Sequence, residues 1–185
     1  MNKMHSVLMT GGLLFAATTL PLSAVTLVTD GRPAATLVVS KAALDAKPYA
    51  PGRGVKAEPA QKIRLAAEEL QRVIEKMSGA KIPLAGEDDA VQGPLVLVGA
   101  SKKTDPLKLD IPAGLTPERN EEGYLIFAKG DTLVLAGNDA GPYQGTFFAV
   151  SELLNRQGVR WFMPGEFGEC IPKQATIAVG NMTFR

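Results

Sequence analysis

The chain of 185 residues is 45% hydrophobic and 21% charged, a composition typical of one globular α/β domain. Its 20 Lys and Arg residues nearly balance its 19 Asp and Glu residues, so no long-range attraction to nucleic acid or to an anionic membrane is expected. The single cysteine, Cys170, excludes an internal disulfide, and we interpret it as a small packing residue.

The first 24 residues have the organisation of a cleaved secretory signal. Lys3 provides positive charge, Val7 to Leu20 form an uncharged apolar run, and small residues precede a cleavage site that we place after Ala24. The prolines and glycines of this segment do not suit a membrane-spanning helix. We therefore predict a signal peptide over residues 1–24, a single domain over residues 25–185, a secreted or periplasmic location, and no membrane contact once the signal is removed.

The predicted mature chain contains no histidine, because His5 is the only one and lies within the signal. Serine and cysteine nucleophiles usually need an imidazole base, and zinc sites usually need histidine or cysteine ligands. We therefore expect neither a metal nor a cofactor. Carboxylates are the remaining candidates for catalysis.

The first part of the domain is predicted to contain a strand pair and a long helix. Two β-rich runs, Val25–Val28 and Leu37–Val39, flank a turn-prone cluster and predict an opening hairpin. A loop rich in proline and glycine follows from Lys47 to Pro59. Apolar residues recur at helical spacing from Ile63 to Met77, with charged residues such as Lys62 on the other face. They predict an amphipathic helix that ends at a glycine.

Strands dominate the remainder of the predicted domain. Gly130 permits a tight reversal and predicts an antiparallel hairpin. The segment Tyr143–Gln157 predicts a second helix that buries Phe147, with help from Phe148. The predicted strands are Lys81–Leu84, Pro94–Val98, Gly123–Ala128, Thr132–Ala136, Val159–Phe162 and Thr176–Val179. The fold class is therefore α+β, with a mixed β-sheet of about six or seven strands and two main helices packed on one face.

Two loops contain residue types that also occur in phosphate-binding sites. Gly137, Gly141 and Gly145 lie between a strand and a helix, but their spacing is not that of GxGxxG, and we expect them to shape the turn. Residues 99–104, GASKKT, lack the upstream glycine and the GK pair of a phosphate-binding loop. We interpret this segment as a solvated loop.

Trp161, the only tryptophan, is adjacent to Arg160 and is followed by Phe162, Met163 and Phe167. An exposed indole can stack on a sugar ring while Arg160 donates to the hydroxyls, or Trp161 can pack under a helix or against another domain. Because successive strand residues alternate between faces, Trp161 and Phe162 cannot both point inward. We predict a carbohydrate site or a domain interface at Arg160, Trp161 and Glu166.

Glu166 and Glu169, with Asp139 before the second helix, are the carboxylates nearest to this aromatic cluster in sequence. A pair of acids can hydrolyse glycosides by acid/base action. Such residues more often form ordinary ion pairs, and Arg156 and Arg160 are close enough in sequence to be their partners. Both interpretations remain open from the sequence.

Two segments carry a resemblance to a known family. The segment AAEELQRVIEKMSGAKIPL (Ala66–Leu84) runs from a helix through a glycine into a strand. The segment from Gly137 to Pro172 joins a glycine turn, a helix and an aromatic strand. Over about Val25 to Pro172 the chain resembles the N-terminal domain of bacterial alpha-glucuronidases and beta-hexosaminidases, as found at the front of secreted glycosidase-like proteins. The resemblance implies a fold like domain 2 of hexosaminidases, followed by a catalytic barrel that would begin after Arg185.

The resemblance implies a non-catalytic accessory domain of a secreted glycoside hydrolase involved in polysaccharide degradation. The partner would be the catalytic barrel of the parent protein or a glycan, and the outward-facing part of Arg160–Glu169 would dock on the barrel or border its cleft. Two alternatives stay open. One is an independent carbohydrate-binding module that uses Trp161 and a tyrosine such as Tyr143, and the other is a small glycosidase that uses Glu166 and Glu169.

Overall fold

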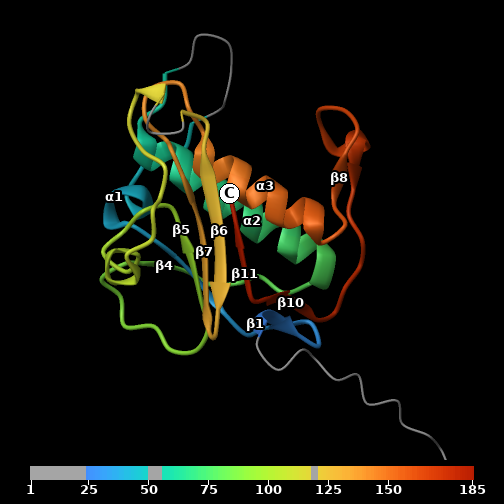
Figure 1. Ribbon diagram of the computed structural model, residues 1–185. Coiled ribbons are helices and arrows are strands. Elements are labelled where there is room, and N and C mark those ends of the chain that lie inside the picture. The colour runs from blue at the N-terminus through green and yellow to red at the C-terminus, as the bar shows by residue number, and fades with distance from the viewer. Residues whose placement is uncertain (1–23, 50–55, 118–120) are drawn as a thin grey trace, which may run out of the picture.

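A computed structural model of the chain describes residues 24–49, 56–117 and 121–185 (Figure 1). The predicted signal lies outside the described residues, except for Ala24, which is the first residue of strand β1 (Ala24–Thr29). His5 and the middle of the predicted loop Lys47–Pro59 also lie outside them. Within the three described ranges, no helix combines the length and the apolar character needed to cross a membrane.

The fold is α+β, as predicted, and is built on a six-stranded mixed sheet. Four neighbouring strands of this sheet are parallel, and β6 is antiparallel to both of its neighbours. The strands in spatial order are β11 (Met182–Phe184), β6 (Tyr124–Lys129), β7 (Thr132–Gly137), β5 (Leu95–Val98), β3 (Thr36–Val39) and β4 (Leu84–Gly86).

The two main helices, α2 (Pro59–Ser78) and α3 (Gly145–Arg156), cover the same face of the sheet (Figure 1). Helix α2 starts at a proline, which suits the first helical position, and the Glu58 N–H donates to the Gln61 side chain at 3.0 Å. It ends at Gly79, whose φ of 78° is the left-handed conformation that closes helices. A short helix, α1 (Lys41–Leu44), follows β3.

The core lies mainly between the helices and the sheet. Because strand residues alternate, Leu37 and Leu133 face the helices and belong to the larger apolar cluster with the buried stripes of α2 and α3. Val38 and Val134 face the other way into a smaller cluster, whose described members include no helical residue. Leu109 and Ile111 of a connecting loop cover that second face.

The predicted opening hairpin is wrong in its pairing. The chain does reverse at Asp30-Gly31, but β1 pairs with β2 (Arg32–Pro33) and with β10 (Ile177–Gly180) in a separate three-stranded sheet. Strand β3 lies instead inside the main sheet, between β4 and β5. The physical reason is that Leu37 and Val38 are buried on opposite faces, as in a central parallel strand covered on both sides.

Three other elements differ from the expectation. The strand predicted at Lys81–Leu84 starts later, as β4. The strand predicted at Val159–Phe162 contracts to β8 (Arg160–Trp161), which pairs with β9 (Glu169–Cys170) outside the main sheet. The last strand, β11, is not predicted by the sequence pattern. Short 3-10 helices occur at η1 (Asp105–Leu107) and η3 (Glu166–Gly168).

Candidate functional site

The β8–β9 hairpin contains most of the predicted site residues and stands apart from the main sheet near the end of α3 (Figure 1). Its turn is closed by a hydrogen bond of 2.9 Å from the Phe162 N–H to the Gly168 carbonyl. A Cβ at Gly168 would collide with the backbone of Met163, so only glycine fits this approach. The turn therefore has little room for inward-pointing side chains.

The hairpin exposes its large apolar side chains. Phe162, Met163 and Phe167 are 77%, 58% and 102% exposed, and Trp161 is 39% exposed. Cys170 is also exposed, so its interpretation as a packing residue is wrong. The reason is that a two-stranded ribbon has no layer of its own to cover these residues.

Ion pairs fasten the hairpin to α2. Glu169, whose side chain is 11% exposed, accepts from Arg72 Nη2 at 2.6 Å and from Lys76 Nζ at 2.9 Å. Lys76 Nζ also lies 3.1 Å from Glu166, which is 85% exposed. Arg72, followed by Lys76, lowers the pKa of Glu169 to about 2. Glu169 is therefore a carboxylate at neutral pH and does not have the raised pKa of a general acid.

The predicted partners of these acids are wrong in identity. Arg156 instead pairs with Glu152 at 2.7 Å, one turn away on the same helix. Arg160 donates from Nη1 to the backbone carbonyls of Asn155 and Val159, at 2.6 and 2.7 Å. Ion pairing is thus the state of Glu166 and Glu169, but the cations come from a helix that is about 90 residues earlier in the chain.

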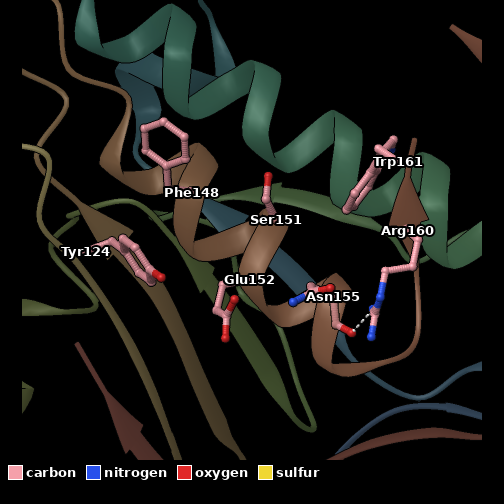
Figure 2. Close-up of a pocket in the computed structure, with 7 residues that line it drawn as sticks. All are labelled: Tyr124, Phe148, Ser151, Glu152, Asn155, Arg160 and Trp161. Carbon is pink, nitrogen blue, oxygen red and sulfur yellow. Dashed lines mark hydrogen bonds between the residues drawn. The ribbon is translucent and has the colours of Figure 1, made fainter. Parts of the chain in front are cut away.

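A groove of about 360 Å³ lies along the outer side of α3, between β6 and β8. In Figure 2, Tyr124 and Phe148 lie toward one end and Trp161 with Arg160 toward the other, with polar side chains of α3 between them. The lining residues are Tyr124, Phe148, Ser151, Glu152, Asn155, Arg160 and Trp161. The groove thus combines three aromatic rings with charged and amide groups.

Several hydrogen-bonding groups of this groove have no partner within the described ranges. They are the Tyr124 hydroxyl, the Asn155 side-chain amide and the Arg160 Nη2, whereas Arg160 Nη1 is used by the backbone (Figure 2). Glu152 accepts from Arg156 through Oε1, which leaves Oε2 without a partner there. These groups are available to a ligand.

Trp161 also lines a second groove, of about 350 Å³, with residues of both main helices. Its other lining residues are Leu65, Glu69, Phe147, Ser151 and Glu169. Since Ser151 and Trp161 belong to both grooves, the indole lies where the two adjoin. Phe148, expected to help bury α3, is 46% exposed and belongs to this outer surface.

The predicted sugar platform of Trp161 and Tyr143 is not assembled. Tyr143 precedes the start of α3 and lines neither groove. Tyr124, which the sequence pattern does not single out, shares the α3 groove with Trp161. The α3 side of the groove does have a sequence signal, because Phe148, Ser151, Glu152 and Asn155 follow one another at the spacing of a single helix face.

Asp139 lies elsewhere, in the buried turn between β7 and α3. It is 7% exposed and accepts from the Thr146 hydroxyl at 2.6 Å and from the Thr146 N–H at 3.2 Å. Burial raises its pKa to about 6, against the opposing effects of Thr146 and Lys62. Asp139 shares no hydrogen-bond partner with Glu166 or Glu169, and among the described residues it forms no carboxylate pair with either of them.

Lys62 completes this turn and is 4% exposed, so its expected place on the solvated face of α2 is wrong. Its Nζ donates to the carbonyls of Asp139, Gly141 and Tyr143 at 2.9, 2.6 and 2.9 Å. All three ammonium donors therefore find acceptors, which is why a lysine is tolerated inside.

The glycines of this turn have a packing role. A Cβ at Gly137 or at Gly145 would collide with the backbone of the other residue or its neighbour.

The loop 99–104 is less solvated than expected. Ser101 and Thr104 are 8% and 2% exposed, and the Ser101 N–H donates to Thr104 Oγ1 at 2.9 Å. Among the described residues, no group of three or more His, Cys, Asp or Glu side chains is placed to hold a metal ion.

No protein-family model matches the chain, and a search of curated proteins finds no significant match.

Proposed function

We propose that the chain is a non-catalytic accessory domain of a secreted glycoside hydrolase involved in polysaccharide degradation, and that its β8–β9 hairpin docks on the catalytic barrel of that protein. The observation that carries the proposal is the exposure of Phe162, Met163 and Phe167 on one short turn. Large apolar side chains gathered on a surface mark sites of interaction with another protein surface.

The way in which the hairpin is held supports docking. Glu169 joins the hairpin to Arg72 and Lys76 of α2, and the turn itself is closed by a backbone hydrogen bond. A surface that is already ordered loses less conformational entropy when it binds a partner. The exposed rings are thus presented by a preorganised support.

The position of the last strand, β11, supports docking of a barrel that would follow it in the chain. Phe184 lies with its ring centroid 6.1 Å from that of Tyr124, and the Arg156 guanidinium lies 4.1 Å from the Phe184 ring centre. A domain joined to the chain after Arg185 would therefore start near α3 (Figure 1), whose residues line a groove together with Trp161.

The electrostatics of the hairpin also fit a structural role. Arg72 and Lys76 neutralise Glu169 and contact Glu166, and the pKa of Glu169 is lowered to about 2. A glycosidase acid needs a raised pKa to be protonated at neutral pH. The contacts of these two acids favour attachment of the hairpin over acid/base catalysis.

The docking proposal is tested with the catalytic barrel that it places after Arg185. The chain and that barrel are produced as separate polypeptides, and their association is measured by calorimetry. Changing Phe162→Ser and Phe167→Ser together should weaken association about 10-fold or more, because buried aromatic anchors dominate interface energies. Leu107→Ser, at an apolar residue 37% exposed outside the hairpin, is the matched control and should have little effect.

Two results would contradict the proposal. One is a stop codon directly after Arg185 together with a gene neighbourhood that encodes no catalytic barrel. The other is hydrolysis of aryl-glycosides by the purified chain that is lost in Glu166→Gln, because that result would make the hairpin a catalytic element.

A further inference from the structure

Resting on the proposed role in polysaccharide degradation, we propose that the α3 groove binds a pyranose ring of a neutral oligosaccharide, with Trp161 as its stacking surface. The groove volume of about 360 Å³ falls at the lower end of the roughly 300–1,000 Å³ that small-molecule sites occupy. The groove is distinct from the exposed turn of the β8–β9 hairpin, since Phe162, Met163 and Phe167 of that turn do not line it.

The aromatic part of the groove fits the apolar side of a sugar. Trp161 and Phe148 are 39% and 46% exposed, so both offer ring surface to a ligand. In Figure 2 the two rings lie toward different ends of the groove, with Ser151 between them. The C–H surface of a pyranose can cover such a ring while its hydroxyls remain at the edge.

The polar part of the groove fits hydroxyl groups, which donate and accept. The Asn155 amide offers both functions, the Tyr124 hydroxyl likewise, Arg160 Nη2 donates, and Glu152 Oε2 accepts. None of these atoms has a hydrogen-bond partner in the described part of the chain. A purely apolar partner surface would leave all four groups without hydrogen bonds on burial, which is costly.

The charges of the groove favour a neutral sugar over a uronate. Among the described residues one acid, Glu152, and one base, Arg160, line it, so a uronate carboxylate would meet a hydrogen-bond acceptor as well as a donor. Glu152 is held in place by Arg156 at 2.7 Å, and Arg156 is in turn packed over the Phe184 ring at 4.1 Å. A uronate carboxylate that approached Arg160 would also meet this fixed carboxylate, whereas a hydroxyl can donate to it.

Because Trp161 is the only tryptophan of the chain, its fluorescence reports on ligands that bind beside the indole, and the groove variants below assign that binding to the α3 groove. The intrinsic fluorescence of Trp161 is followed while cellohexaose, xylohexaose or mannohexaose is added, and oligogalacturonate serves as the acidic comparator. We expect a saturable change with at least one neutral oligosaccharide, and weaker binding of oligogalacturonate.

Two conservative variants locate the site. Asn155→Ala and Tyr124→Phe each remove one hydrogen-bonding group while leaving the stacking surface, so each should weaken binding about 3- to 10-fold. Gln92→Ala is the matched control, because Gln92 is an exposed amide outside the groove. Circular dichroism melting checks that all variants are folded.

The proposal is overturned if no neutral oligosaccharide gives a saturable change, if both variants bind like the parent chain, or if oligogalacturonate binds more tightly. The Phe162→Ser, Phe167→Ser variant separates this result from docking, because it should weaken association with the barrel and leave sugar binding unchanged. Sugar binding without docking would refute the proposed docking alone, and docking without sugar binding would refute this inference alone.

Discussion

The β7–α3 turn and the β8–β9 hairpin handle charge in opposite ways. In the turn, Asp139 is 7% exposed, and burial raises its pKa to about 6. In the hairpin, Glu169 meets two cations, which lower its pKa to about 2. The difference shows that the turn uses buried polar groups to fix the fold, whereas the hairpin uses ion pairs to hold an exposed apolar surface in position.

The largest effect is expected when the ammonium is removed from the buried turn. Lys62→Met keeps much of the side-chain volume but leaves the carbonyls of Asp139, Gly141 and Tyr143 without their donor. Each buried acceptor that loses its donor costs about 1 to 3 kcal/mol of unfolding free energy, so the three together should cost about 3 kcal/mol or more. Urea denaturation of the parent chain and of Lys62→Met measures this loss of unfolding free energy.

Lys81→Met is the control for this change, because Lys81 is exposed and the same substitution there should be nearly neutral. A loss of less than about 1 kcal/mol in Lys62→Met would mean that the turn does not depend on its lysine. The contrast between the two regions would then disappear.

The next effect is the pH dependence contributed by Asp139. Its pKa is raised from 3.8 to about 6, so the folded chain binds a proton between these values that the unfolded chain does not. The Asp139 contribution to stability therefore increases as pH falls from about 7 to 4, by up to about 3 kcal/mol. The charged or titratable groups that face it are Lys62 of α2 and Tyr49 of the preceding loop.

The measurement compares the parent chain with Asp139→Asn, which does not titrate. The difference between their unfolding free energies should change in favour of the parent chain as pH falls through 6. A difference that is constant between pH 7 and pH 4 would show that the carboxyl is not held in a desolvated state. Thr146→Ser, which keeps the hydroxyl donor, should retain the pH dependence of the parent chain.

The sequence predicts the regular part of the fold well because that part is local. The apolar spacing from Ile63 to Met77 and the glycine that follows define α2, and Gly130 defines the β6–β7 hairpin. The pairing of β1 with β10 depends instead on contacts between the two ends of the chain. Periodicity carries no information on which distant strand becomes a neighbour.

The site is predicted only in part, for a similar reason. Trp161 and Arg160 are found from the sequence because the aromatic strand is conspicuous, but Tyr124 reaches the groove from β6. Lys62 has the periodicity of a solvated residue, and only the three carbonyls of a turn about 77 to 81 residues away explain its burial. Polar groups satisfied by tertiary contacts leave no local signal.

The smallest effect is expected at the base of the hairpin. Glu169→Gln should lower the unfolding free energy by about 1 to 2 kcal/mol at pH 7, because it weakens hydrogen bonds to Arg72 and Lys76, which are each 37% exposed and partly screened by water. Since the pKa of Glu169 is lowered from 4.5 to about 2, its contribution is present above pH 4.5 and is lost as pH falls toward 2. This is the opposite sign to Asp139.

Glu166→Gln is the matched control, because Glu166 contacts the same lysine but is 85% exposed, and its loss should change stability very little. Equally small changes in unfolding free energy for the two substitutions would mean that the hairpin is held by its own turn and not by α2. If Glu169 is the attachment point, Glu169→Gln should also weaken docking without removing any exposed ring, because a looser hairpin loses more entropy when it binds. Substitution of Glu169 would then lower both the unfolding free energy and the affinity for the barrel, whereas substitution of Phe162 would lower the affinity alone.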